Sequence, residues 1–202
     1  MPRSKWPRRI ICDLSDVLIK GLRGVEVSLS GLLGLPEKEI SDSLYVYDFS
    51  PLWLGKKSED DFLAELISRT GWQLDTPTLK RHIRDNFTEI DGTRDVYSRL
   101  ARKRELALLS VNAREWAEFM ESRFRYQHLF SAGVFYSYQI GFTKREAGSF
   151  AHVVRALGVP PRELLFIDDS KRFVDMAATV GIRGILFENS QKLQSDLDEI
   201  GV

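Results

Sequence analysis

Residues 10 to 17 read Ile-Ile-Cys-Asp-Leu-Ser-Asp-Val, and residues 164 to 169 read Leu-Leu-Phe-Ile-Asp-Asp. Each stretch is an apolar run that ends in a carboxylate, Asp13 in the first and Asp168 with Asp169 in the second. A strand buried on both faces has no place for an aspartate in its middle, so we expect these acids at the carboxyl ends of two strands. Open α/β sheets bind their ligands at that edge. The two stretches therefore predict one shared metal site.

The second half of the chain alternates strand and helix signals, which is the pattern of repeated βαβ units. The sequence predicts strands over residues 9–13, 106–110, 133–137, 164–168 and 184–187, and helices over residues 113–126, 146–157 and 170–180. This alternation predicts an α/β fold built on a five-stranded, mainly parallel sheet.

Between residues 22 and 90 the pattern changes to helical periodicity with few strand signals. One predicted helix covers residues 58–69, where Ser58 and Asp61 can form a capping box. We therefore expect two units: a core of residues 1–20 and 91–202, and an inserted helical cap of residues 21–90. The chain should hinge near residues 19–21 and 91–94. The cap's aromatic residues have the spacing of core packing more than that of a binding surface; they are Tyr45, Tyr47, Phe49 and Trp53.

Composition and charge set limits on the class of protein. The 202 residues are 43% hydrophobic, enough for a full core, and Lys plus Arg equals Asp plus Glu at 29 each. A formal charge near zero gives no overall attraction to nucleic acid or to an anionic membrane, so we expect neither as a partner. The basic start of the chain, with Arg3, Lys5, Arg8 and Arg9, is expected to be a solvated tail.

No apolar stretch approaches the ~18 residues that span a bilayer, and the first residues lack the apolar segment of a secretory signal. The sequence therefore predicts a soluble, cytoplasmic protein. Cys12 is the only cysteine, which excludes an internal disulfide and argues against a cysteine-based zinc cluster.

Four short motifs in order resemble those of the haloacid dehalogenase (HAD) superfamily of phosphatases. Asp13-Leu14-Ser15-Asp16-Val17 is similar to its first motif, Ser110 to its second, the segment from Ser137 through Gly141 to Lys144 to its third, and Asp168-Asp169 to its fourth. The resemblance covers nearly the whole chain. The helical insertion, with the segment from Gly55 to Phe62, is similar to the cap of the branch that contains dehalogenases, phosphoglycolate-type phosphatases and the phosphatase domain of soluble epoxide hydrolases. It implies a Rossmann-like core with a mobile helical lid.

This resemblance implies an Mg²⁺-dependent hydrolase, a phosphatase acting on a small phosphorylated metabolite. Asp13 would be the nucleophile that forms an aspartyl-phosphate, and a nearby cation would reduce its repulsion from the phosphate dianion. The metal ligands would be Asp13, the backbone carbonyl of Ser15, Asp168 and Asp169, because Mg²⁺ prefers oxygen. Ser110 and Lys144 would bind the phosphoryl oxygens. Asn112 either contacts the substrate or caps the next helix.

One departure from the superfamily's pattern bears on the chemistry. Ser15 stands two residues after the nucleophile, where the phosphatases usually carry a second Asp that protonates the leaving group. A serine hydroxyl does not titrate near neutral pH, so it cannot act as that acid, and the expected enzyme is a weak phosphatase. Asp16 can substitute only if the backbone is irregular at the end of the strand, because adjacent strand residues point to opposite faces.

Smaller departures surround this one. Arg145 stands in place of the usual Pro after the lysine, Val111 in place of a frequent Asn, and Phe173 in place of a polar residue that supports the metal acids. Lys20 and Arg23 follow the first motif closely enough to meet an anionic tail of the substrate, but we leave them outside the predicted site.

Two alternative functions stay open on these residues. The first is a catalytically degenerate protein of the same fold that binds metal or phosphate and turns over little. The second is haloacid dehalogenase or phosphonate chemistry on the same nucleophile. Dinucleotide binding is disfavoured, because no G-x-G-x-x-G follows the first strand. The sequence predicts neither the identity of the substrate nor the oligomeric state.

Overall fold

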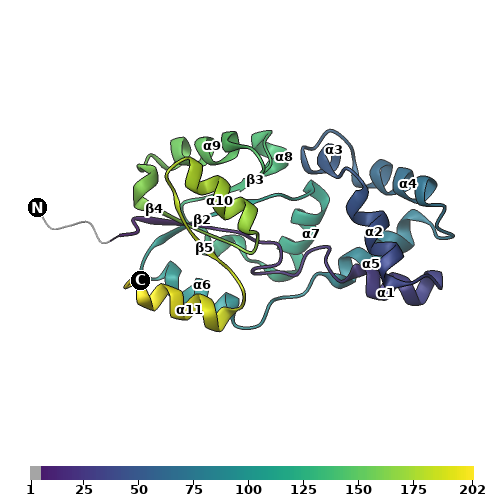
Figure 1. Ribbon diagram of the computed structural model, residues 1–202, viewed down its shortest axis with the longest axis horizontal. Helices are drawn as coiled ribbons and strands as arrows, with labels where there is room; N and C mark the ends of the chain where they lie inside the picture. The colour runs from purple at the N-terminus through teal and green to yellow at the C-terminus, as the bar shows by residue number, and fades with distance from the viewer. Residues whose placement is uncertain (1–5) are drawn as a thin grey trace, which may run out of the picture.

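The computed structural model describes residues 6–202, which form a central sheet, helices on both of its faces and a group of helices at one end (Figure 1). In chain order the elements are β1 (Arg9–Cys12), α1 (Val25–Leu33), α2 (Glu37–Val46), α3 (Ser50–Trp53), α4 (Glu59–Thr70), α5 (Thr76–Asn86), α6 (Thr93–Ala101), β2 (Glu105–Ser110), α7 (Arg114–Phe124), β3 (Gly133–Tyr136), α8 (Ser137–Ile140), α9 (Ala147–Leu157), β4 (Leu164–Asp168), α10 (Lys171–Thr179), β5 (Arg183–Leu186) and α11 (Ser190–Glu199). Two short 3₁₀ helices lie at Gln127–Leu129 and Pro161–Glu163.

The sheet has five strands in the order β3-β2-β1-β4-β5, and every neighbouring pair is parallel. This confirms the predicted five-stranded α/β core. The chain builds outward from β1 to β2 and β3 on one side, and then returns to add β4 and β5 on the other. The strand order reverses between β1 and β4, and ligands of open α/β sheets bind at the carboxyl end of such a switch point.

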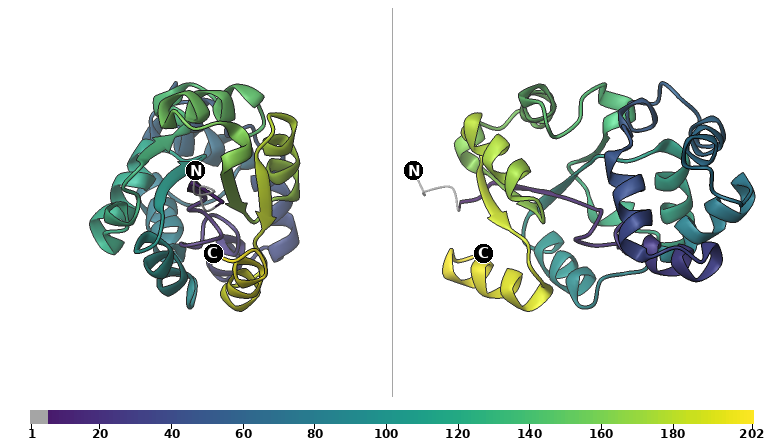
Figure 2. Two further views of the ribbon diagram at one scale, coloured as in Figure 1. Left: turned by 90° about the vertical axis from the view of Figure 1, so that its left-hand side faces the viewer. Right: turned by 45° about the vertical axis from the view of Figure 1, so that its right-hand side comes forward.

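Two apolar clusters cover the faces of the sheet, because successive strand residues point to opposite sides. Ile11 packs on one face with residues of α9 and α10, such as Phe150 and Ala177. Ile10 packs on the other face, where α6 and α11 contribute Val96 and Leu193. Figure 2 shows these helices on either side of the sheet.

Helices α1 to α5 lie together beyond the end of the sheet toward which β1 runs (Figure 1). The chain enters and leaves this helical group along two adjacent segments. The backbone N–H of Lys20 donates to Thr88 O at 2.8 Å, and that of Ile90 donates to Leu18 O at 3.0 Å. Ile19 forms an antiparallel bridge with Glu89 between them. Residues 18–20, which lead into the helical group, and residues 88–90, which lead out of it, are thus hydrogen-bonded side by side.

The helical group also contacts the core through buried polar groups. The indole N–H of Trp116, on α7, donates to Glu59 Oε1 at 2.7 Å. Glu59 begins α4, is only 1% exposed, and pairs with Lys80 at 3.1 Å and Arg84 at 2.8 Å. A second contact runs from the Ser137 hydroxyl to the carbonyl of Trp53 at 2.7 Å.

Local signals account for several boundaries. Ser58 is the N-cap of α4, and its Oγ accepts the N–H of Asp61 at 3.1 Å, so the predicted cap is present. The predicted basic tail was wrong for Arg9, which lies in β1 with its Nε 2.7 Å from Glu105 Oε2. Arg3 and Lys5 lie outside the described residues. Within residues 6–202, no helix combines the length and apolar character needed to cross a bilayer.

Candidate active site

Three carboxylates and one ammonium meet at the carboxyl ends of β1 and β4. Asp13 follows β1, Asp168 ends β4 and Asp169 comes next in the chain. Their carboxylate oxygens lie within 4.8 Å of one another. Lys144 Nζ lies 2.6 Å from Asp13 Oδ2 and 2.5 Å from Asp168 Oδ2. The structure therefore brings together four of the residues that the two acid-tipped strands and the lysine motif predict.

The charges of this cluster are buried. Asp13 is 3% exposed, Lys144 2% and Asp168 0%, while Asp169 is partly exposed. Burial raises the pKa of Asp13, and the Lys144 ammonium opposes that effect. Burial alone would lower the pKa of Lys144, but the charges of Asp13 and Asp168 outweigh it and raise that pKa. Burial and the charge of Asp168 raise the pKa of Asp169 to about 6.

These residues fit a divalent cation. The donor set is entirely oxygen, and three carboxylates face one ammonium, so an ion of charge +2 would balance the excess negative charge. Burial is the main reason that the pKa values of Asp13 and Asp169 are raised, and repulsion from Asp168 adds to it at both groups. Mg²⁺, which takes few carboxylates and keeps several waters, matches such a site.

Neighbouring groups fix the orientation of the acids. Asp13 Oδ1 accepts the N–H of Leu14 at 2.7 Å, and Asp168 Oδ1 accepts the N–H of Ser170 at 2.8 Å. The hydroxyl of Tyr97, a fully buried residue of α6, donates to the carbonyl of Asp13 at 3.3 Å. Sequence reasoning missed Tyr97, whose only signal was an aromatic residue on a helix that was not predicted.

Ser110 and Asn112 lie at the carboxyl end of β2, the strand that pairs with β1, and both are buried. Ser110 ends β2, beside β1, and its fully buried Oγ has no hydrogen-bond partner among residues 6–202. Asn112 is 2% exposed, and its Nδ2 is also without a partner in that part of the chain. The idea that Asn112 caps the next helix was wrong, since Ala113 is the N-cap residue of α7 and no side chain caps it.

The loop after Asp13 is irregular. Asp16 has a φ of 59°, in the left-handed region that few non-glycine residues adopt, and its Oδ1 accepts the N–H of Gly21 at 2.9 Å. Ser15 forms an isolated bridge with Ile19. The irregular backbone that Asp16 would need in order to face the site is therefore present. The hydrogen bond from the Gly21 N–H, however, holds the Asp16 carboxylate within the turn.

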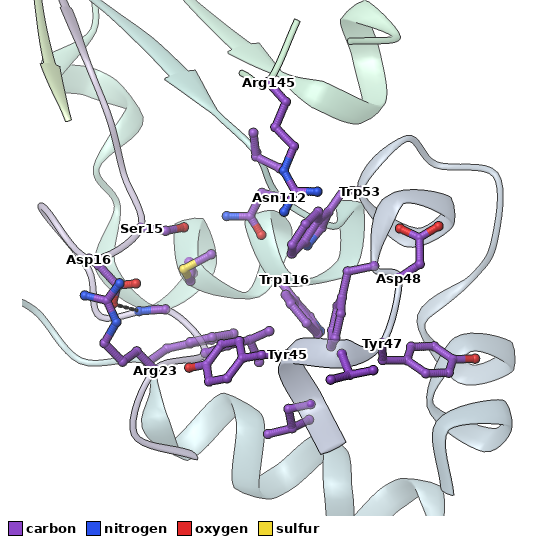
Figure 3. Close-up of a pocket in the computed structure, with 18 residues that line it drawn as sticks. Ser15, Asp16, Arg23, Tyr45, Tyr47, Asp48, Trp53, Asn112, Trp116 and Arg145 are labelled. Carbon is purple, nitrogen blue, oxygen red and sulfur yellow. Dashed lines mark hydrogen bonds between the residues drawn. The ribbon is translucent and has the colours of Figure 1, made fainter. Parts of the chain in front are cut away.

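Two adjoining cavities open at this edge of the sheet. The inner cavity, of about 250 Å³, is lined by Asp13, Lys144 and Asp169. The outer cavity, of about 420 Å³, is lined by six aromatic residues, five of them from residues 45–87 and the sixth Trp116 of α7, and by polar residues that include Asp48 and Asn112. Both are bordered by Ser15, Asp16, Arg23, Trp53, Val111 and Arg145. Figure 3 shows the outer cavity with Ser15 and Asp16 on one side and Trp53 on the other.

Comparisons with known proteins agree with this geometry. No protein-family profile matches the chain. A chloroplast flavin mononucleotide hydrolase of Arabidopsis thaliana is 25% identical over 193 residues, which are 96% of this chain and 77% of that protein. A predicted HAD-like family hydrolase from Porphyromonas gingivalis is 25% identical, with a TM-score of 0.75 and coverage of 96% of this chain and 97% of that one. A HAD family enzyme of Bacteroides thetaiotaomicron, solved with magnesium and inorganic phosphate, has a TM-score of 0.76 at 20% identity over 90% of this chain and 94% of that one.

The chain is therefore similar to HAD-like hydrolases and has their fold. Solved structures of the Bacteroides thetaiotaomicron enzyme contain magnesium, and the three clustered carboxylates of this chain are a donor set that suits the same ion.

The departures from the superfamily's motifs have clear positions. Phe173 does not support the acids by hydrogen bonding, but its ring centroid lies 5.1 Å from Lys144 Nζ, so it contacts the lysine that holds them. Arg145 is exposed and borders both cavities. Arg23, which we left outside the predicted site, borders both cavities too, and its guanidinium lies 3.5 Å from Asp169.

Proposed function

We propose that this protein is an Mg²⁺-dependent phosphatase that hydrolyses a small phosphorylated metabolite through an aspartyl-phosphate on Asp13. The observation that carries the proposal is the position of Lys144 between Asp13 and Asp168, with Asp169 completing a set of three carboxylates. A buried ammonium in that place serves both a nucleophilic carboxylate and an incoming phosphate dianion.

The reaction follows from this placement. A carboxylate oxygen of Asp13 attacks phosphorus, an O–P bond forms, and the bond to the leaving oxygen breaks with its electron pair. Water then attacks the aspartyl-phosphate and releases inorganic phosphate and the free Asp13 carboxylate. Lys144 neutralises charge on both groups. A bound Mg²⁺ would supply further positive charge to the same oxygens. Ser110 and Asn112, whose buried polar atoms lack partners among the described residues, can donate hydrogen bonds to phosphoryl oxygens.

Without a general acid at position 15, only phosphate esters with good leaving groups should be hydrolysed fast. Ser15 cannot protonate the leaving oxygen, and general acid help is typically worth about 10² to 10⁴-fold. Enzymatic phosphate hydrolysis can exceed the uncatalysed rate by up to about 10²¹-fold, so a phosphatase without that acid is still an effective catalyst. Acyl and other phosphates with good leaving groups should depend least on the missing proton.

We assign the choice of substrate to residues 21–90, acting as a cap on the core formed by residues 1–20 and 91–202. This segment supplies most of the rings that line the outer cavity. The similar Arabidopsis protein is named for hydrolysis of flavin mononucleotide (FMN), which makes FMN the first substrate to test.

The test is Mg²⁺-dependent release of inorganic phosphate from FMN, sugar phosphates, acyl phosphates and small-acid phosphates. Wild type is run beside Asp13→Asn, which keeps the side-chain size and removes the nucleophile. We expect turnover that a chelator abolishes and that falls below a few per cent in the variant. Equal turnover in both proteins would remove Asp13 as the nucleophile.

The substitution of Ser15 for the usual acid favours one second candidate, a protein that binds phosphate but turns over little. Trapping separates the two. A beryllium fluoride complex mimics an aspartyl-phosphate, and with Mg²⁺ it should stabilise an active enzyme but not Asp13→Asn. Phosphate binding without such trapping, and without turnover of any substrate, would favour the binding protein.

A further inference from the structure

Trp53 lies where the inner and outer cavities meet. It is half-buried, ends the short helix α3 and lines both the inner cavity with Asp13 and the outer cavity with Trp116. A molecule that places a phosphate against Lys144 and extends into the outer cavity must therefore pass Trp53. Figure 3 shows its indole beside Asn112 and across the cavity from Ser15.

Contacts with neighbouring residues hold Trp53 in place. Phe49 stacks on it with ring centroids 5.3 Å apart and an interplanar angle of 29°. The carbonyl of Trp53 accepts the Ser137 hydroxyl at 2.7 Å, which ties this end of α3 to the core. A ring fixed in this way loses little conformational entropy when a ligand packs on it.

Buried aromatic side chains support the wall of the outer cavity beside Trp53. Trp116 is 3% exposed, and its indole N–H is anchored by the buried carboxylate of Glu59 at 2.7 Å. Phe87 packs edge-on to Trp116 at 5.9 Å, and Tyr45 borders the cavity from α2. Polar groups on the same wall, among them Asp48, Asn112 and Arg145, can bind the polar atoms of a substrate. The exposed part of the Trp53 indole is the flat apolar face on which a planar ring gains from stacking.

We propose that Trp53 is a specificity-determining residue that stacks against a planar ring in the leaving group of the phosphate ester. The inference rests on the proposed function and narrows its substrate to esters of ring-bearing alcohols, such as flavin or nucleoside phosphates. The phosphate lies in the inner cavity and the ring in the outer one.

The test compares a ring-bearing and a ringless substrate. In Trp53→Leu the wall stays apolar but loses its flat face, and in Trp53→Phe a smaller flat face remains. We expect Trp53→Leu to lower the ratio of kcat/KM for FMN to kcat/KM for acetyl phosphate by about tenfold or more, the usual range for one aromatic–base stack. KM for FMN should rise more than kcat falls, because stacking acts on the bound ring in all states. Trp53→Phe should restore much of the ratio.

Trp6→Leu is the matched control. Trp6 lies at the opposite end of the sheet, where its N–H donates to the carbonyl of Arg162 at 2.9 Å, and it borders neither cavity. This variant should keep the wild-type ratio. Because the ratio compares two substrates of one protein sample, partial unfolding of a variant cancels from it.

A binding measurement separates failure of this inference from failure of the proposed function. Riboflavin carries the ring without the phosphate, and stacking on tryptophan should quench its fluorescence. Quenching by wild type that is lost in Trp53→Leu supports the inference even if no phosphate ester is hydrolysed. Hydrolysis of acetyl phosphate without riboflavin quenching, and with an unchanged substrate ratio in Trp53→Leu, would overturn it and leave the phosphatase proposal intact.

Discussion

Lys144 is the residue on which the electrostatics of the site depend. Its ammonium is 2% exposed and lies within 2.6 Å of Asp13 and 2.5 Å of Asp168, so it is the nearest positive charge to two buried carboxylates. Removing one partner of a buried ion pair typically costs about 3–5 kcal/mol, because the other charge stays buried without compensation. The contacts that would prepare Asp13 as the proposed nucleophile therefore also stabilise the fold.

We expect Lys144→Met to lower the free energy of unfolding by about 3–5 kcal/mol when a chelator is present, measured by urea denaturation. Lys171→Met is the control, since Lys171 is 76% exposed and pairs with Asp175 on the surface of α10. Exposed pairs contribute about 0–1 kcal/mol, so the control should barely change. Equal losses in the two variants would mean that the buried cluster does not stabilise this protein.

Ser15 gives the second prediction at this scale. If the missing acid limits turnover, Ser15→Asp should raise hydrolysis of phosphomonoesters with poor leaving groups, by up to about 10² to 10⁴-fold. Ser15→Asn is the control: asparagine has nearly the shape of aspartate but no titratable proton, so this variant should hydrolyse these esters no faster than wild type. The ratio of rates for a sugar phosphate and acetyl phosphate is the measurement. A gain shared by both variants, or by neither, would assign leaving-group protonation to another group.

Individual site residues differed in how far the sequence predicted them. Asp13 and Asp168 were predicted because an acid after a buried apolar run has few structural alternatives, and that signal is local. The contact between Phe173 and Lys144 and the place of Trp53 between the cavities depend on how distant segments pack. Aromatic spacing alone favoured a core role for Trp53, since periodicity does not distinguish a buried ring from one that lines a cavity.

At the scale of elements, the strands were predicted to within about one residue, because each apolar run has clear polar ends. Their order was not predicted, since strand pairing depends on contacts between distant residues. Helix α11 (Ser190–Glu199) was not predicted either: it is largely polar and contributes few buried residues, among them Leu193 and Leu197. Helix α8 (Ser137–Ile140) was not predicted, because four residues are too few to show the helical period of apolar residues.

Helix α4 offers a test of a local signal. Ser58 Oγ accepts the N–H of Asp61, and replacing such a cap by Ala usually costs about 0.5–2 kcal/mol. We expect Ser58→Ala to lower the free energy of unfolding by about 1 kcal/mol. Ser43→Ala is the control, because Ser43 lies inside α2, where Ala is the better helix former. A loss in Ser43→Ala as large as in Ser58→Ala would argue against a capping effect.

At the scale of the whole molecule, the site joins parts of the chain that are far apart in sequence. Asp13 follows β1, Asp168 ends β4, and Lys144 lies in the loop before α9. The helical group adds the outer cavity, and the link from Glu59 to Trp116 fastens it to α7. Such a site exists only in the folded chain, so a metal that binds it must stabilise the entire fold.

This linkage gives the last prediction. Free Mg²⁺ at 100 times its dissociation constant should add about 2.7 kcal/mol to the stability, which for a chain of this size raises Tm by roughly 5–10 °C. Thermal unfolding in Mg²⁺ and in chelator measures the shift. Asp169→Asn removes one of the three clustered carboxylates and should reduce it sharply. Asp175→Asn, at a surface acid on α10 that is 61% exposed, should keep it. The same shift in both variants would place the stabilising ion elsewhere, whereas its loss only in Asp169→Asn would tie the metal, the acid cluster and the stability of the whole chain to one site.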